Sequence, residues 1–221
     1  HHFEFTDPFW VLIATILSHR TKDEVTDAAA RSLYNRYHDA HGLAAASEEE
    51  VLGLIRKVGF SRVKTPRIIN ASRIILERFG GSVPTTVDDL VTIPGVGRKT
   101  ANVVMADAHR IPAIAVDTHV LRISNRLGIS RSKNPEDVEI ALTKIVPKDI
   151  WLGFNPRLVE FGKKICRPVG PRCEICSISE FCDYYSKKRG KATTQSQVRK
   201  KKTGKDSRKQ ARSGVDPFIW I

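Results

Sequence analysis

The chain has 221 residues, 41% of them hydrophobic, and carries a formal net charge of +13. This length allows one large domain or two small ones, and the hydrophobic fraction is sufficient for a packed core. No apolar run approaches the roughly 18–20 residues that cross a bilayer, so we expect no membrane partner. The four cysteines are confined to one short segment. This confinement argues against a disulfide framework and favours a reducing, intracellular compartment.

The positive charge is concentrated at the C-terminus. Residues 187–221 hold 12 Lys or Arg and 2 Asp, which gives +10, and residues 1–186 hold the remaining +3. Ser, Thr, Gln and Gly fill the spaces between these cations, a composition typical of disordered segments. We therefore expect residues 187–221 to be a basic disordered tail. It would serve either as a nonspecific tether to DNA phosphates or as a solubilising extension.

Helical periodicity extends along the rest of the chain. Asp7-Pro8 is a helix-start signal, Ser47 precedes an acidic first turn, and Thr86 with Asp89 resembles a capping box. No segment shows sustained period-two alternation, so we predict an all-α protein. The predicted helices cover 9–17, 23–37, a segment from 47, 63–79, a segment from 86, 98–109, 120–127, 135–145 and 150–165.

A glycine-containing turn separates two of these helices. Pro94 ends the first helix, and Gly95 and Gly97 let the backbone turn sharply and let a ligand approach the main chain. The next helix starts near Arg98, so its free N–H groups point into the turn and form a site suited to a DNA phosphate. A plain helix–helix connector uses the same residue types and remains the alternative.

Lys99 lies in the first turn after this hairpin. The positive end of the helix dipole disfavours an ammonium group there, and imine chemistry requires a neutral amine. Lys99 is therefore a candidate nucleophile, with a surface lysine that contacts phosphate as the alternative.

Asp117 follows an apolar stretch and precedes a helix, a position typical of a simple cap. In a fold that brings it close to Lys99, Asp117 can accept a proton, orient a water or stabilise a sugar cation. No second His or carboxylate stands at ligand spacing to His119, which favours a structural role or a phosphate contact over metal binding.

All four cysteines form the pattern C-x6-C-x2-C-x5-C, with the members Cys166, Cys173, Cys176 and Cys182. Zinc sites usually pair two C-x2-C knuckles across a longer gap, whereas only the middle pair has that spacing here. An iron–sulfur cluster with four thiolate ligands fits the pattern better, and a zinc-stabilised interaction protein is the alternative.

Together, Leu17-Ser18, the hairpin motif Ile93–Ala101, Val116-Asp-Thr-His119 and the cysteine pattern closely resemble endonuclease III, a family of helix–hairpin–helix DNA glycosylases. The resemblance covers about Asp7 to Tyr185. It implies a two-lobed fold with a six-helix barrel domain over 1–112, containing the hairpin at about 86–109. A 4Fe–4S cluster domain over 113–186 and the tail 187–221 complete the expected organisation.

The resemblance also implies a function. A member of this family is a monomeric, nucleoid-associated cytoplasmic enzyme that excises oxidised pyrimidines from duplex DNA and cleaves abasic sites by β-elimination. The family's lysine falls on Lys99, which would form a Schiff base with C1′, and its aspartate falls on Asp117. The family's cluster ligands fall on the four cysteines. The expected DNA contacts are Gly95, Val96, Gly97, Arg98, Thr100 and His119.

Base extrusion leaves a hole in the duplex that the enzyme must fill. Phe60, in the loop Val58–Arg62, matches the family's wedge position, with ordinary packing at a helix end as the alternative. Arg20 matches the second gap-filling position, where bacterial members commonly have Gln. This chain also begins at about the point where the family's usual N-terminal helix ends.

Other functions stay open beside this one. The adenine-mismatch branch has a small residue in place of Lys99 and a catalytic Glu near the first helix, which is missing at the expected place here. The thymine-mismatch branch typically has Tyr at the lysine position, and thymine or uracil excision remains an alternative. A noncatalytic helix–hairpin–helix DNA-binding module is a further alternative.

Overall fold

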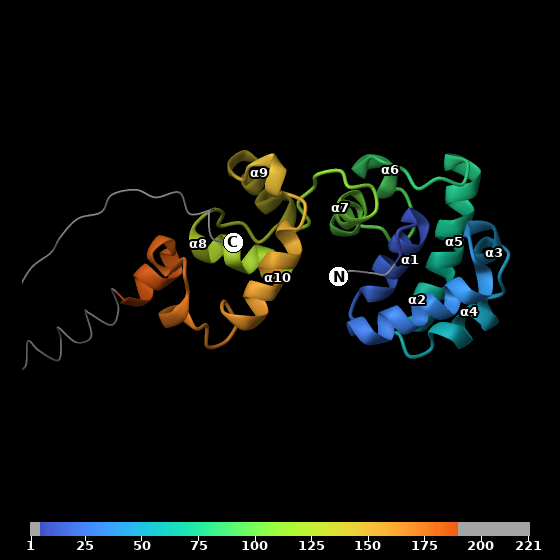
Figure 1. Ribbon diagram of the computed structural model, residues 1–221, viewed down its shortest axis with the longest axis horizontal. Helices are drawn as coiled ribbons and strands as arrows, with labels where there is room; N and C mark the ends of the chain where they lie inside the picture. The colour runs from blue at the N-terminus through green and yellow to red at the C-terminus, as the bar shows by residue number, and fades with distance from the viewer. Residues whose placement is uncertain (1–4, 190–221) are drawn as a thin grey trace, which may run out of the picture. The chain divides into compact units, whose positions relative to one another are not determined.

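The computed structural model describes residues 5–189 (Figure 1). Helices and connecting segments make up this part of the chain, which contains no strand, so the all-α prediction is confirmed. The chain divides into two compact units. The first consists of His1–Ala115 and Trp151–Gly153, and the second of Val116–Ile150 and Phe154–Ile221. The sequence-based boundary lies between residues 112 and 113.

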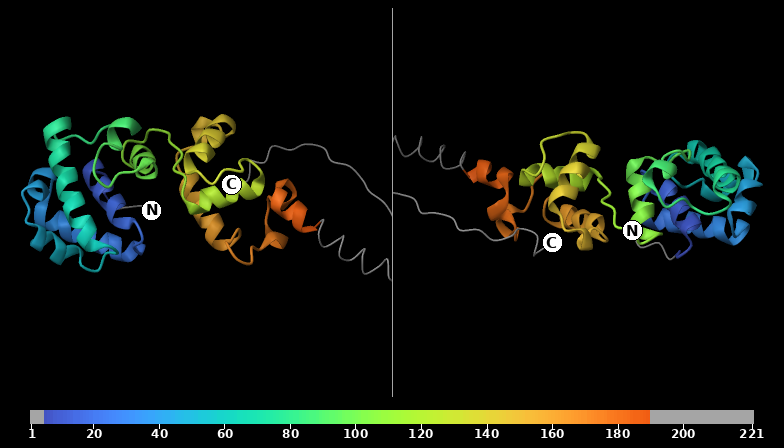
Figure 2. Two further views of the ribbon diagram at one scale, coloured as in Figure 1. Left: turned by 180° about the vertical axis from the view of Figure 1, so that it is seen from behind. Right: turned by 90° about the horizontal axis from the view of Figure 1, so that it is seen from above.

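The first unit is built around helix α1 (Pro8–Ser18). Nine of its eleven residues are buried, including Trp10 and Leu12, which are fully inaccessible. A helix that is apolar on all sides belongs in a core, and α1 contacts α2, α5 and α7. Figure 2 shows this unit from two further directions. Its other helices are α2 (Asp23–Tyr37), α3 (Ala40–Ala44), α4 (Glu48–Ile55), α5 (Ser61–Phe79), α6 (Val87–Leu90) and α7 (Arg98–Asp107).

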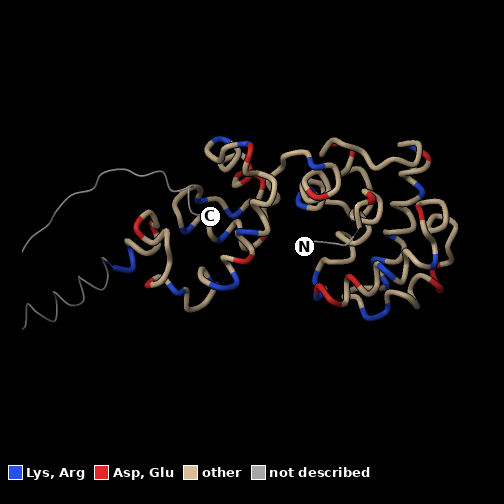
Figure 3. The backbone as a smooth tube through the Cα atoms, in the orientation of Figure 1, with Lys and Arg blue, Asp and Glu red and all other residues tan. Residues whose placement is uncertain are grey.

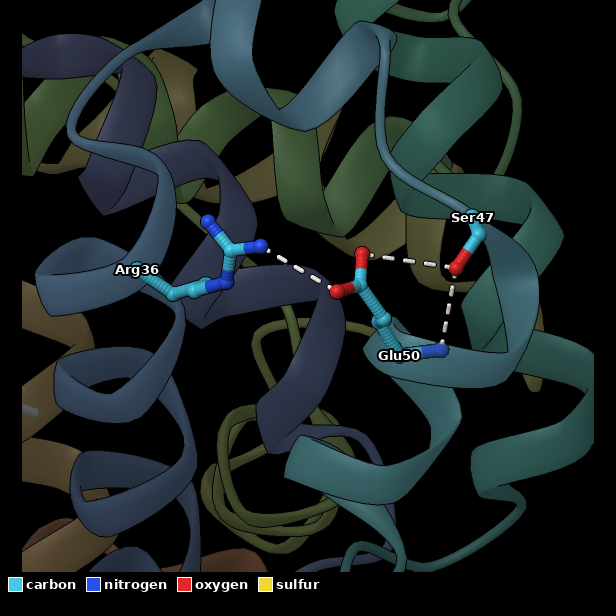
Figure 4. A network of polar contacts seen from close by, with 3 residues as sticks. All are labelled: Arg36, Ser47 and Glu50. Atoms are coloured by element: carbon cyan, nitrogen blue, oxygen red, sulfur yellow. Dashed lines mark hydrogen bonds and ion pairs between the residues drawn. The ribbon is translucent and has the colours of Figure 1, made fainter.

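A capping box starts α4 and also connects it to α2 (Figure 4). The Ser47 hydroxyl accepts a hydrogen bond from the Glu50 backbone N–H at 3.3 Å, as its position in the sequence predicts. The Glu50 carboxylate in turn accepts from Arg36 Nη2 at 3.1 Å. Both side chains are more than half exposed, so this ion pair orients the helices more than it stabilises them.

The second unit contains α8 (Thr118–Leu127), α9 (Pro135–Ile145) and α10 (Phe154–Lys164). Its apolar interior includes Val120 and Ile123 of α8, Leu142 of α9 and Leu158 of α10. The cysteine-containing segment follows α10 with two 3-10 turns, Cys173–Ile175 and Ser179–Phe181, and residues 183–189 are helical.

The structure corrects several predicted bounds. The helix predicted over 150–165 begins only at Phe154, because Gly153 has a left-handed backbone (φ +83°) after the 3-10 turn Lys148–Ile150. The short helix α3 is not predicted from the sequence. Residues 187–189 of the expected tail are helical, and the rest of the tail lies outside the described residues. None of the helices within residues 5–189 has the length and apolarity that a bilayer span requires.

Candidate active site

The hairpin between α6 and α7 is anchored by its apolar residues and presents its glycines. Ile93 and Val96 are buried, and the Val96 N–H donates to Ile93 O at 3.0 Å to close the turn. Gly95 adopts φ +85°, which favours glycine. Gly97 is exposed at the N-cap of α7. Val96 can therefore offer a ligand only its backbone, whereas Gly97 leaves the main chain open to approach.

The first turn of α7 follows directly. Among the described residues, no side chain caps this helix, and the same is true of α2 and α5, whereas α1, α4, α6, α8 and α9 each have a side-chain cap. Arg98 is exposed and Lys99 is half-buried. An uncapped helix start beside exposed glycine backbone favours anion binding.

Thr100 has a different environment from its neighbours in the hairpin motif. Its side chain is buried, and Oγ1 lies 3.0 Å from Nε2 of His19, which follows α1. Burial lowers the pKa of His19, and the nearby cations Lys99, Lys64 and Arg67 lower it further, so the imidazole is neutral at pH 7. The Thr100 hydroxyl thus links α7 to the end of α1 rather than facing solvent.

The two predicted gap-filling residues lie together. Phe60 is 58% exposed, and the guanidinium carbon of Arg20 lies 5.5 Å from the centre of its ring. Both residues have left-handed backbones, with φ +59° for Phe60 and +52° for Arg20. An exposed aromatic on a strained backbone is uncommon and is a feature of functional loops.

Lys64 of α5 lies beside this pair and was not predicted from the sequence. It is 4% exposed, and its ammonium donates to Leu17 O at 2.7 Å, His19 O at 2.6 Å and Thr21 Oγ1 at 3.2 Å. Burial lowers the pKa of Lys64 to about 8, and the Arg67 guanidinium adds to the shift.

This shift predicts a pH dependence of stability. The unfolded chain keeps the Lys64 proton up to the ordinary pKa of 10.5, whereas the folded chain releases it near pH 8. The unfolded state therefore binds more protons between these values, and the free energy of unfolding should rise with pH across this window. Chemical denaturation of wild type and Lys64→Met at pH 7, 8, 9 and 10 measures this effect. The free energy of unfolding of wild type should increase relative to that of Lys64→Met between pH 8 and pH 10. No such increase would contradict the prediction.

In the second unit, Asp117 is the N-cap of α8. Its Oδ1 atom accepts hydrogen bonds from the backbone N–H groups of His119 (2.8 Å) and Val120 (2.9 Å). The capping alternative for this residue is thus realised. Both bonds end on the same oxygen, so the cap does not use Oδ2, and the half-buried carboxylate can combine capping with a chemical role.

His119 is held against α10 by Arg122. Arg122 Nη2 lies 3.1 Å from His119 Nδ1 and donates to Gly162 O at 3.2 Å, and its Nε donates to Cys166 O at 3.0 Å. A Cβ on Gly162 would lie 2.4 Å from His119 Nδ1, so only glycine allows this approach. Burial is the main cause that lowers the pKa of His119.

The four cysteines are free thiols that line one cavity, together with Arg126 and Tyr184 among others. Burial is the main cause that raises the pKa of the Cys173 and Cys176 thiols, and the proximity of the other cysteines adds to it. Four thiolates gathered in this way need a cationic centre, so the donor set fits an iron–sulfur cluster. Within residues 5–189, no three His, Cys, Asp or Glu side chains are placed to bind a single metal ion directly.

Arg126 of α8 organises the loop around these thiols. Its Nη1 donates to Cys166 Sγ at 3.3 Å and to Arg167 O at 2.8 Å, and its guanidinium carbon lies 4.6 Å from the Tyr184 ring centre. The Cys182 thiol donates to Arg126 O at 3.3 Å. Lys and Arg occur in both units (Figure 3). The half-buried Arg126 side chain contacts the cysteine-containing loop.

The structure thus gathers the predicted residues into two groups. Lys99, the hairpin glycines, Arg20 and Phe60 belong to the first unit. Asp117, His119 and the four cysteines belong to the second.

Comparison with known proteins gives this arrangement a family context. Residues 13–148 match the HhH-GPD superfamily of base excision DNA repair proteins. Endonuclease III of Thermotoga maritima is 48% identical over 186 residues, covering 84% of this chain and 87% of that protein. Endonuclease III of Bacillus subtilis is 40% identical and covers 80% of this chain and 81% of its own length.

Two solved structures have a fold similar to that of this chain. A trapped covalent intermediate of endonuclease III with DNA superposes with a TM-score of 0.78 at 36% identity, covering 86% of this chain and 90% of that one. A thermostable thymine-DNA glycosylase gives a TM-score of 0.76 at 28% identity, covering 85% and 89%.

Proposed function

Because this chain belongs to the endonuclease III family of HhH-GPD base excision DNA repair proteins, we propose that it excises oxidised pyrimidines from duplex DNA and then cleaves the abasic strand. The chain is a base excision DNA glycosylase. We propose two further points: its lesions are oxidised pyrimidines, and Lys99 is the residue that couples base excision to strand cleavage. The observation that carries the proposal is the position of Lys99, in the uncapped first turn of α7, two residues past exposed Gly97.

In this reaction, Lys99 first gives up its ammonium proton, and its amine then attacks C1′ of the damaged nucleoside. The C1′–N bond breaks, and the base leaves with the electron pair and takes up a proton. The attacking nitrogen then gives up one proton, and its lone pair expels the ring oxygen O4′, which takes up a proton, so that the ring opens and a protonated Schiff base results. Solvent removes a C2′ proton, the imine accepts the released electrons, the C3′–O bond breaks, and the 3′ phosphate leaves. Asp117 stabilises the positive charge on the sugar and takes up a proton that the reaction releases.

DNA is held through its phosphates by the hairpin backbone, Arg98 and His119, while Arg20 and Phe60 fill the gap in the duplex. The partner is duplex DNA that contains damaged pyrimidines or abasic sites, and the protein acts as a monomer. Since this substrate is genomic DNA, we place the enzyme inside the cell, with the nucleoid.

A lesion panel tests the substrate class. Duplexes with thymine glycol, an abasic site, a G·T mismatch and a G·U mismatch are incubated with the protein, and base release and strand cleavage are measured separately. We expect release and cleavage at thymine glycol and cleavage at the abasic site. Base release from the mismatches alone would instead favour the thymine or uracil activity. Binding to every duplex without reaction would favour a noncatalytic module.

We also propose that the four cysteines hold a 4Fe–4S cluster. When bound, the cluster supplies structural cross-linking, and the loop around it presents Arg167 and Arg172 beside Lys163 and Lys164. The free thiols that line one cavity support this proposal.

Removal of one ligand tests the cluster directly. Cys176→Ser is expected to lose iron, acid-labile sulfide and brown colour, and to destabilise the second unit by several kcal/mol because the metal centre contributes to its folding. The exposed neighbour Ser177, replaced by Ala, is the matched control. Elemental analysis of both variants and wild type measures the metal. Stoichiometric zinc without iron in the wild-type protein would contradict the assignment.

A further inference from the structure

We propose that Lys64 is a positioning residue for base extrusion: its ammonium locks the α1–α2 loop against α5 and so holds Arg20 and Phe60 in their gap-filling conformation. The proposal rests on the glycosylase function proposed above. The two loops concerned are residues 19–22, between α1 and α2, and residues 56–60, between α4 and α5.

The ammonium is fully engaged by the α1–α2 loop. It has three protons to donate, and its three acceptors are Leu17 O, His19 O and Thr21 Oγ1. Leu17 O belongs to the last turn of α1, where carbonyls have no partner within the helix. One buried side chain of α5 thus ends α1 and fixes the path of the chain on both sides of Arg20.

A second connection joins the same loops. The Gly59 N–H donates to Thr21 Oγ1 at 3.1 Å, so the Thr21 hydroxyl is shared with Lys64. A Cβ on Gly59 would lie 2.4 Å from Arg20 O. This spacing is below any van der Waals contact, so only glycine lets the two loops approach. Arg20, which precedes Thr21, and Phe60, which follows Gly59, are therefore placed by contacts between the loops.

The gap-filling side chains depend on these contacts. Arg20 and Phe60 both have positive φ, a backbone conformation that is unfavourable for a residue with a Cβ. Such conformations persist only where the surroundings impose them. The backbone of Arg20 is held because two acceptors of the Lys64 ammonium, His19 O and Thr21 Oγ1, lie on either side of it. The backbone of Phe60 is held by Gly59 before it and by Lys64 in the first turn of α5. Their side chains then stack at 5.5 Å.

Stability alone does not account for a lysine at this position. The ammonium is buried, and the neighbouring charge that acts on it is another cation, the Arg67 guanidinium. An apolar side chain of similar length would fill the same space without desolvating a charge. A costly buried charge beside strained, exposed side chains is the pattern expected where conformation serves function.

The test compares a paired with an unpaired lesion. Thymine glycol is placed in a fully paired duplex, or in the same duplex within a short unpaired bubble, where extrusion is already largely complete. Lys64→Met should lower kcat/KM about tenfold on the paired substrate and no more than about twofold in the bubble. Thr21→Val, which removes the shared hydroxyl, should show the same contrast more weakly. Lys57→Met, an exposed lysine in the α4–α5 loop, should leave the ratio of the two rates unchanged.

Equal losses on both substrates, or no loss on either, would overturn the positioning role. If the wild-type protein releases no base from either substrate, the glycosylase proposal fails instead. Trypsin cleavage after Arg20 then still tests whether Lys64 holds the α1–α2 loop against α5. Cleavage should be faster in Lys64→Met than in wild type or Lys57→Met, and an unchanged rate would contradict this role of Lys64.

Discussion

Replacement of Lys99 by Gln is expected to lower base release from thymine glycol duplex by at least ~1,000-fold and to abolish strand cleavage. Gln has nearly the same length and remains polar, but its amide cannot attack C1′ or form an imine. Lys99 is half-buried in the first turn of α7 and does not belong to the buried core, so folding and DNA binding should persist. Single-turnover kinetics, with binding measured separately, give both quantities.

Lys144→Gln is the matched control for this variant, because Lys144 is an exposed lysine of α9 that no proposed step uses. Its rates should equal those of wild type. Retention of base release within about tenfold in Lys99→Gln would mean that another group attacks the sugar.

The second large effect is expected at Asp117. Asn at this position can accept the same two hydrogen bonds through Oδ1, so the cap of α8 persists while the negative charge is lost. If Asp117 stabilises the sugar cation, Asp117→Asn should slow base release about 100-fold and change the free energy of unfolding by less than about 1 kcal/mol.

Asp39→Asn separates chemistry from capping. Asp39 caps α3 by accepting from the Gly42 N–H at 2.9 Å, and its replacement removes a charge from a comparable cap elsewhere. Both variants should unfold like wild type, and only Asp117→Asn should lose activity. If Asp117→Asn is as active as Asp39→Asn, then Asp117 is a cap and nothing more.

Much of the fold was predictable because the residues next to a helix start specify where the helix begins. Asp7-Pro8 and Ser47 define the starts of α1 and α4, and both caps form as the sequence predicts. The late start of α10 was missed even though its signals are local. Gly153 interrupts the apolar pattern, and Pro156 suits a first helical turn. The helical spacing of apolar residues across 150–165 favours a longer helix and conflicts with these two signals.

The candidate site was only partly predictable. Lys99 and Asp117 are placed by short motifs at helix starts, and the cysteines by their spacing. Lys64, Arg122 and Arg126 could not be found in this way. Their partners are largely backbone carbonyls that lie far away in the sequence, such as Leu17 O for Lys64 and Cys166 O for Arg122. Any residue type offers such a carbonyl, so no pattern records the contact before the fold is known.

The most direct measurement of the central claim is borohydride trapping. Wild-type protein is incubated with thymine glycol duplex in the presence of sodium borohydride, and the covalent product is digested and sequenced by mass spectrometry. We predict a stable protein–DNA adduct with the deoxyribose remnant on the Nζ of Lys99. Complete base release with no adduct, or an adduct on a different amine, would contradict the assignment of Lys99 as the Schiff-base nucleophile.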